Sequence, residues 1–244
     1  MRKLNLVAML VTCSLILTSC LEDSKDTIIL PEIIVVEDVP DDIIPASIRS
    51  EFESHMSIYE GKLPPIIQGE YVMSEMVLSY NSVGDFEIGH VFSDCYMAFL
   101  NQVGGSCQYA EKQASSTSYA EKVYITGNNN DFTAYFVAHH QRSDGYTWST
   151  MSTLVSGTIS SAGIKNCKYA FIMLEKNDPD DKLMPVNGYR VFYDNTNLAS
   201  RQSWYEESQK APTRMQQSEN KGIQDMLEKN MLNVENVSER SIEK

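Results

Sequence analysis

Residues 66–193 carry a period-two pattern of apolar and polar side chains, and this pattern predicts β-strands. The clearest runs are 132–138, 169–174 and 189–193, which are rich in Tyr, Phe, Val and Ile. Groups of Gly, Asn, Asp and Ser separate the runs, as they do in hairpin turns. We therefore predict an all-β fold, an antiparallel meander of about eight strands within residues 62–200.

A meander of this size can close into an up-and-down barrel, whose interior is either filled by side chains or encloses one small ligand. Gly69-Glu70-Tyr71, near the start of the pattern, is similar to the Gly-x-Trp sequence that opens the first strand of lipocalin-like, or calycin, barrels. Tyrosine stands here in place of the tryptophan. The resemblance implies a calycin-like barrel in which the glycine allows a tight entry and the Tyr71 ring closes the base.

A helical pattern precedes the strands. Apolar residues recur at helical spacing between residues 47 and 61, Ser47 is a candidate N-cap and Gly61 can end the helix. We expect one amphipathic helix over 47–61 that packs its apolar side against the barrel. That side is formed by Ile48, Phe52, His55 or Met56, and Tyr59.

The start of the chain has the layout of a secretory signal: Arg2 and Lys3 precede an apolar run over residues 4–17. The run is too short for a transmembrane helix. Leu17-Thr18-Ser19-Cys20 resembles a lipobox, the motif of lipoprotein signal peptides. The resemblance implies that residues 1–19 are removed and that Cys20 becomes acylated, which anchors the protein to a membrane without spanning it. The alternative is an ordinary secretory signal with an incidental cysteine.

Residues 20–46 contain three prolines among acidic and aliphatic residues, which indicates an extended tether of at most about 85 Å. Residues 27–36 are apolar enough that they either stay free, add a strand or dock along the domain. Glu22, Asp23 and Asp26 resemble the export signal of surface lipoproteins of Bacteroidota-type bacteria, which implies display on the cell surface, with the periplasmic side of the outer membrane as the alternative. The polar residues 201–244 form a tail that is partly helical or disordered.

Charge excludes one class of partner. The chain has a net charge of −13, which becomes −15 when Arg2 and Lys3 are removed with the signal. An acidic surface repels phosphate groups, so we expect no nucleic acid partner and no peripheral binding to anionic membranes. We also expect no cofactor.

Three cysteines remain after removal of the signal and acylation of Cys20. Cys95 and Cys107 flank a turn-like Gly-Gly sequence and are a candidate disulfide across a hairpin, because an exported compartment allows disulfides. The alternative is that these two and Cys167 are small buried apolar residues.

Candidate catalytic and metal-binding residues are few. His139 and His140 are adjacent on a predicted strand, so their side chains point to opposite faces and cannot readily chelate one ion. Asp178, Asp180 and Asp181 could supply oxygen ligands for calcium, but they also match ordinary turn chemistry. Known nucleophile, zinc-protease, phosphate-loop and dinucleotide motifs are absent from the sequence. We predict no catalytic residue and no metal site.

Aromatic residues are the remaining candidates for contacts. Most are expected to fill the core, while Tyr146 and Trp148, beside a predicted turn, are the best candidates for an exposed contact. Six aromatic residues are candidates to line a cavity or a sugar-stacking face: Tyr119, Tyr124, Tyr135, Tyr146, Trp148 and Tyr169.

A longer resemblance covers much of the domain. The sequence from Gly61 to Ser74, with Pro64-Pro65-Ile66-Ile67-Gln68-Gly69-Glu70-Tyr71 at its centre, resembles the opening of uncharacterised surface lipoproteins of Bacteroidota-type bacteria. The stretch from Ser156-Gly157-Thr158-Ile159 through Tyr169-Ala170-Phe171-Ile172-Met173-Leu174 also resembles that group. The resemblance therefore covers roughly residues 47–200, and it brings no known activity. We expect a non-catalytic binding module for a small apolar ligand, a glycan or a protein partner. The alternatives are a structural or accessory subunit of a cell-surface assembly and a hydrolase with paired carboxylates.

Overall fold

The structure is a computed structural model that describes residues 37–41 and 43–205. These residues belong to one compact unit, Ile34–Lys244; a second unit, Met1–Ile33, lies outside the described residues, as does Cys20. The elements in chain order are α1 (Ala46–His55), β1 (Gly69–Met73), β2 (Met76–Asn81), β3 (Val91–Phe92), β4 (Cys95–Val103), β5 (Ser106–Gln113), β6 (Ser116–Asn128), β7 (Asp131–Arg142), β8 (Trp148–Ser160), β9 (Gly163–Asn177), β10 (Tyr189–Asp194) and β11 (Leu198–Arg201).

Three of the strands are bent and are interrupted by two or three residues. Met73 at the end of β1 lies opposite Cys95 of β4, and Met76 at the start of β2 lies opposite Phe92 of β3, so β1/β2 and β3/β4 pair in one continuous register. In the same way β10 pairs with β2 while β11 pairs with β1. The eleven segments therefore make eight strands.

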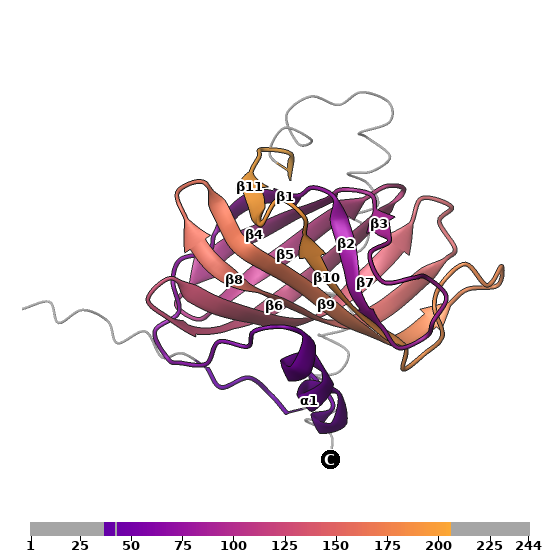
Figure 1. Ribbon diagram of the computed structural model, residues 1–244, viewed down its shortest axis with the longest axis horizontal. Coiled ribbons are helices and arrows are strands. Elements are labelled where there is room, and N and C mark those ends of the chain that lie inside the picture. Colours follow the sequence, from indigo (N-terminus) through magenta and orange to yellow (C-terminus); the bar gives the residue numbers. More distant parts are fainter. Residues whose placement is uncertain (1–36, 42, 206–244) are drawn as a thin grey trace, which may run out of the picture. The chain divides into compact units, whose positions relative to one another are not determined.

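These eight strands form a closed antiparallel ring (Figure 1). Each strand pairs with the next along the chain, and β11 closes the ring by pairing with both β1 and β9. Closure satisfies the backbone groups that an open edge would leave unpaired. The predicted all-β meander of about eight strands is confirmed.

Strand β7 has apolar residues on both its inner and its outer face, because each face packs against a different part of the protein. Phe132, Ala134 and Phe136 point into the barrel and belong to its main core. Tyr135 points outward and belongs to a second cluster with Phe52 of α1. A strand buried on both faces needs apolar residues at nearly every position, whereas a half-exposed strand alternates.

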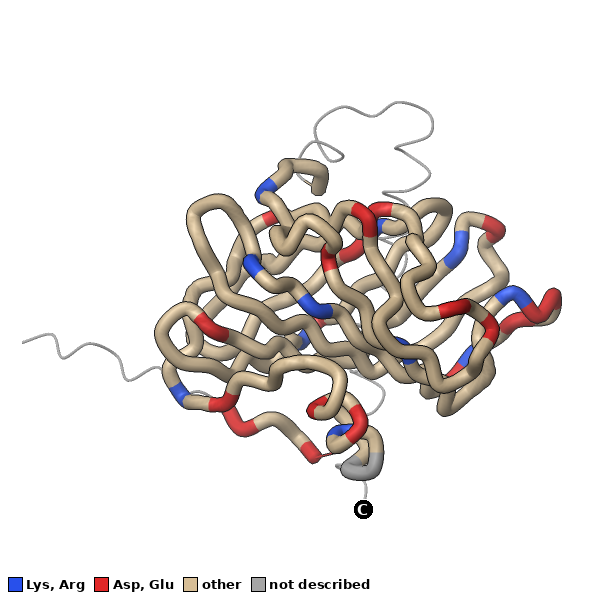
Figure 2. Tube along the Cα trace, in the orientation of Figure 1, with Lys and Arg blue, Asp and Glu red and all other residues tan. Residues whose placement is uncertain are grey.

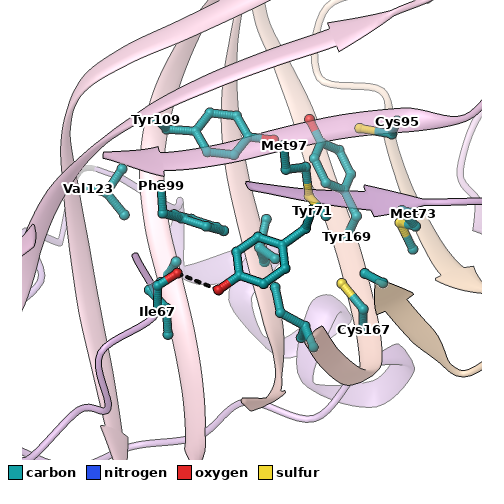
Figure 3. Close-up of a cluster of buried hydrophobic side chains, with 14 of the residues drawn as sticks. Ile67, Tyr71, Met73, Cys95, Met97, Phe99, Tyr109, Val123, Cys167 and Tyr169 are labelled. Carbon is teal, nitrogen blue, oxygen red and sulfur yellow. Dashed lines mark hydrogen bonds between the residues drawn. The ribbon is translucent and has the colours of Figure 1, made fainter. Parts of the chain in front are cut away.

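One end of the barrel, which we call the base, is filled by large side chains. Figure 3 shows Tyr71 of β1 among Ile67, Phe99 and Tyr109, and all four are fully buried. The Tyr71 hydroxyl donates a hydrogen bond of 2.8 Å to the Ile67 carbonyl. The Arg201 guanidinium of β11 lies 5.0 Å from the Tyr71 ring centroid. Tyr71 therefore closes the base and links the first strand to the last.

The helix is shorter than predicted. It begins after Pro45, which forms no side-chain cap, so the expected Ser47 cap is wrong, and it ends at His55. The backbone N–H of Tyr59 donates to Thr133, and Thr126 donates to the Tyr59 carbonyl, at 2.8 and 2.6 Å. These contacts fix residues 57–61 against β6 and β7 in an extended conformation, so the helix cannot continue to residue 61.

Gly61 has a different role from the predicted helix end. Its φ angle is +140°, and a Cβ atom there would lie 2.4 Å from the carbonyl oxygen of Gly127 on β6. The missing side chain allows the segment before β1 to approach that strand closely.

Two flanking segments dock on the outside of the barrel. Ile43 and Ile44 of the expected tether are buried with α1, and Ser152 of β8 donates to the Ile43 carbonyl. Trp204, at the start of the expected tail, packs beside Ala98 and Tyr119. Its Nε1–H donates a hydrogen bond of 3.2 Å to the Met97 carbonyl. Residues 27–36 and 206–244 lie outside the described residues, so the free or docked state of these segments stays a prediction.

The expected disulfide is wrong. Cys95, Cys107 and Cys167 are free and buried. Cys95 of β4 lies opposite Gln113 of β5, six residues from Cys107 along the same strand. At about 3.3 Å per residue this separates the two thiols by about 20 Å, far beyond disulfide reach. The alternative, three buried apolar residues, is confirmed.

Candidate ligand cavity

The end of the barrel opposite the base is hollow. A cavity of about 540 Å³ lies where β5, β7 and β9 end and where β6, β8 and β10 begin. Small-molecule sites generally occupy roughly 300 to 1,000 Å³. The barrel is thus filled over one half and open over the other.

One wall of the cavity is polar. Glu111 of β5 lies opposite Ser118 of β6, and Ser118 lies opposite His140 of β7. His140 in turn lies opposite Ser149 of β8. All but Ser118 line the cavity, and Ser118 is buried between Glu111 and His140. Directly opposed residues on neighbouring strands share one face of the sheet. The four side chains therefore form one row across the inner surface, which we call the polar row.

Glu111 is the one acid of this row, and it is buried. Its carboxyl group accepts a hydrogen bond of 2.5 Å from the Tyr109 hydroxyl and one of 3.3 Å from Ser118. Burial disfavours the charged form and raises the pKa of Glu111 above its ordinary value, while hydrogen bonds from Tyr109, Tyr169, Ser118 and Cys95 oppose that shift. The hydroxyl groups hold the carboxyl oxygens at the cavity floor.

His140 is a neutral member of the same row. Burial lowers its pKa to about 4, and Arg142 adds to the effect. Its Nδ1 lies 3.2 Å from the Ser118 hydroxyl, with tautomer-dependent donor and acceptor roles. Since Nδ1 is engaged by Ser118, Nε2 is the ring nitrogen that remains for a ligand.

The opposite wall is apolar and comes from β2, β3, β9 and β10. The rings of Phe171 and Phe192 are stacked at 6.0 Å, and Phe92 meets Phe192 edge-on at 5.4 Å. Met76 and Met173 complete this wall. The cavity therefore has one polar and one aromatic side.

Arg190 lies at the apolar wall, and its side chain is about nine-tenths buried. Its Nη2 donates to Asp85 of the loop between β2 and β3, and the guanidinium lies 5.1 Å from the Phe86 ring centroid. The Nε–H has no hydrogen-bond partner among the described residues, and the same holds for the Ser149 hydroxyl across the cavity. A buried donor without a partner costs about 1–3 kcal/mol, and more if it is charged.

The two aromatic residues predicted to be exposed are exposed. Tyr146 and Trp148 have 45% and 37% of their surface accessible, whereas Tyr119, Tyr135 and Tyr169 are buried. The Tyr146 hydroxyl donates a hydrogen bond of 2.7 Å to the Asp180 carboxylate. The Nζ of Lys182, a residue that lines the cavity, lies 5.6 Å from the Tyr146 ring centroid. Tyr146 is thus linked to the rim of the cavity rather than to its interior.

The histidine pair is divided between the faces of β7. His140 lines the cavity, while His139 is exposed on the outside and lies 3.4 Å from the Thr150 hydroxyl. The two imidazoles cannot meet at one ion, as their adjacency on a strand predicted.

The aspartates between β9 and β10 are engaged by lysines. Lys176 lies 3.1 Å from Asp178 and 3.4 Å from Asp181, and Lys182 lies 2.8 Å from Asp180. Within residues 37–41 and 43–205, no group of three or more His, Cys, Asp or Glu side chains could hold a metal ion. Red and blue segments adjoin in the loop after β9 (Figure 2).

The polar row does not reproduce a nucleophile triad. In a Ser-His-Asp triad the histidine lies between the acid and the serine and is oriented by the acid. Here Ser118 lies between Glu111 and His140 and is only 1% exposed. The order of the three side chains therefore differs from that of a triad.

Sequence reasoning did not single out Glu111, Ser118, Ser149 or Arg190. The signal was present, since these residues stand at inward positions of strands whose other inward residues are apolar. Finding it requires the strand register, which a single sequence does not give.

Fold and cavity together define an antiparallel eight-stranded barrel with a closed base and a two-sided cavity at its other end. No protein family, curated protein or solved structure matches the chain. Among the residues that the structure describes, no helix is long and apolar enough to cross a membrane.

Proposed function

We propose that the mature chain is a lipid-anchored lipoprotein outside the cytoplasm. Its barrel acts as a non-catalytic module that binds a small molecule in its cavity. The observation that supports binding is the hollow half of the barrel, lined by polar groups on one wall and by Phe and Met on the other. A cavity with a few oriented polar groups in an apolar surround is typical of small-ligand sites. Of the three ligand classes expected from the sequence, a small apolar ligand, a glycan or a protein partner, the two-sided lining favours an amphipathic small molecule over a purely apolar one.

Thermal unfolding in the presence of a chemically diverse small-molecule library tests this proposal. We expect some compounds to raise the melting temperature of the mature chain, because a ligand that binds only the folded state stabilises it. Ser149→Phe should abolish these shifts, since it places a ring in the cavity and removes a hydroxyl that has no described partner.

Thr150→Phe is the matched control, because the neighbouring residue lies opposite the exposed His139 on the outer face of the sheet. It adds the same ring on the other side of β8 and should leave the shifts intact. Shifts that survive Ser149→Phe, or a library without any hit, would contradict binding in the cavity.

A further inference from the structure

We propose that the cavity selects a neutral, hydroxyl-bearing ring molecule the size of a mono- or disaccharide, with its hydroxyls on the polar row and a ring face on the Phe wall. This inference rests on the proposed function, because it names the ligand class for the same cavity. It follows from the mixture of donors and acceptors, from the charges and from the shape of the two walls.

The hydrogen-bonding groups of the cavity call for a ligand that both donates and accepts. Arg190 Nε and the Ser149 hydroxyl lack described partners, and both are buried. His140, neutral at pH 7, offers Nε2, and the Glu111 carboxyl lies in the same row. A hydroxyl group is both donor and acceptor, so several hydroxyls on one molecule can satisfy all of these groups.

The same groups disfavour the two simpler ligand classes. A purely apolar molecule would fill the cavity and leave the Arg190 Nε–H and the Ser149 hydroxyl without partners, which is unfavourable for buried polar groups. An anion would have to share a small space with Glu111 and with Asp85, and Asp85 already holds Arg190. Asp181, Arg142 and Lys182 also line the cavity, so acids and bases are equal in number, three each, and the lining offers an anion no excess of positive groups.

The apolar wall fits the flat face of a ring. Phe171 and Phe192 are stacked side by side, and Phe92 adds an edge at the same wall. Flat rings cover the C–H face of a sugar, while the hydroxyls at the sugar edge remain free for hydrogen bonds. A ligand of this class therefore matches both walls at once.

Isothermal titration calorimetry with two probe sets tests the proposal on the detergent-solubilised mature chain. One set contains neutral sugars: glucose, galactose, N-acetylglucosamine, maltose and lactose. The other contains the anions laurate and benzoate. We expect at least one sugar to bind with a Kd of about 1 mM or tighter and to bind more strongly than both anions.

Three variants locate the bound sugar. Arg190→Lys keeps a positive charge for Asp85 but removes the Nε–H, and we expect a loss of affinity of about tenfold or more. Ser149→Ala should weaken binding by about fivefold. Trp148→Ala removes an exposed ring from the residue that precedes Ser149 in β8, and it should leave the affinity unchanged.

Each other outcome overturns the inference. Binding of laurate or benzoate that Ser149→Phe abolishes, with no sugar binding, would leave the cavity function intact and refute the ligand class. Sugar binding that Trp148→Ala abolishes and Arg190→Lys does not would place the site on the outside. If no sugar binds at 10 mM, the ligand class is wrong, and the library experiment decides separately whether the cavity binds anything.

Discussion

Glu111, Ser118, His140 and Ser149 are polar side chains at inward positions of strands that otherwise bury apolar residues. Buried polar groups are tolerated when they are hydrogen-bonded. Glu111 and Ser118 meet this condition through each other and through Tyr109. Ser149 does not, because its hydroxyl has no partner among the described residues, and for this reason we propose it as a ligand contact.

The free energy of unfolding of the Glu111→Gln variant, minus that of the natural chain, should increase as the pH rises from 4 to 8. Burial raises the pKa of Glu111, so its contribution to stability is full below the ordinary value and is lost as the pH rises above it. Glutamine cannot ionise and removes this loss. Urea denaturation of both proteins across this pH range measures the difference, and a difference that falls with pH would refute the argument.

Glu111→Ala is the companion change and should lower the free energy of unfolding at every pH in that range. It removes the acceptor for the Tyr109 and Ser118 hydroxyls in a fully buried place. The Tyr109 hydroxyl loses its partner, which costs about 1–3 kcal/mol, whereas the Ser118 hydroxyl keeps His140 Nδ1 as a partner.

His140 predicts a pH dependence of the opposite sign. Burial lowers its pKa to about 4 from an ordinary value of 6.5, so the folded chain binds fewer protons than the unfolded chain between these values. Its contribution to stability is present above about pH 6.5 and is lost as the pH falls through 4, by up to about 3 kcal/mol at about 1.4 kcal/mol per pKa unit. His140→Gln should lose stability less steeply on acidification from pH 6.5 to 4 in the same urea experiment, whereas an unchanged slope would contradict a buried neutral imidazole.

At the scale of elements, closure of the ring depends on β9. This strand pairs with β8 along one edge and with β11 and then β10 along the other. Gly163 begins β9 at a φ of +145°, and a Cβ atom there would lie 2.1 Å from the Ala199 carbonyl oxygen of β11. A side chain at Gly163 would therefore push apart the pair that closes the barrel.

Gly163→Ala should destabilise the protein by about 2 kcal/mol or more, because strained backbone and a steric conflict add together. Gly145→Ala is the matched control, since Gly145 also has a positive φ of +80° but has no atom within 4 Å of the added Cβ. Thermal melting of the two variants separates strain from close approach. Equal losses of stability would show that closure at β9 and β11 does not depend on this contact.

The elements show which features a single sequence can predict. Alternation over residues 132–138 predicted a strand because the side-chain period of a strand is local. The end of α1 was misjudged because distant residues, Thr126 and Thr133, hold Tyr59 in an extended segment. The same limit applies to the disulfide, which depends on the register of β4 and β5. It also applies to the cavity, whose walls come from strands as far apart in sequence as β2 and β10.

At the scale of the whole molecule, the proposal combines an anchor and a binding barrel. Cys20→Ala in the natural precursor should move most of the protein from the membrane fraction to the soluble fraction, because two or three acyl chains would anchor it stably. Cell fractionation followed by immunoblotting measures this, with Cys13→Ala, inside the expected signal, as the matched control. Continued membrane association of the Cys20 variant would refute the anchor without affecting the cavity.

The central claim is that the hollow half of the barrel is a ligand site, and a crystal structure of the mature chain soaked with the tightest-binding sugar tests it most directly. We predict the sugar in the cavity, with an oxygen within about 3.2 Å of Arg190 Nε, a second contact to Ser149 or His140, and a ring face on Phe171 and Phe192. A sugar bound only at the outer surface beside Tyr146 and Trp148, or a cavity closed by its own side chains, would contradict the claim.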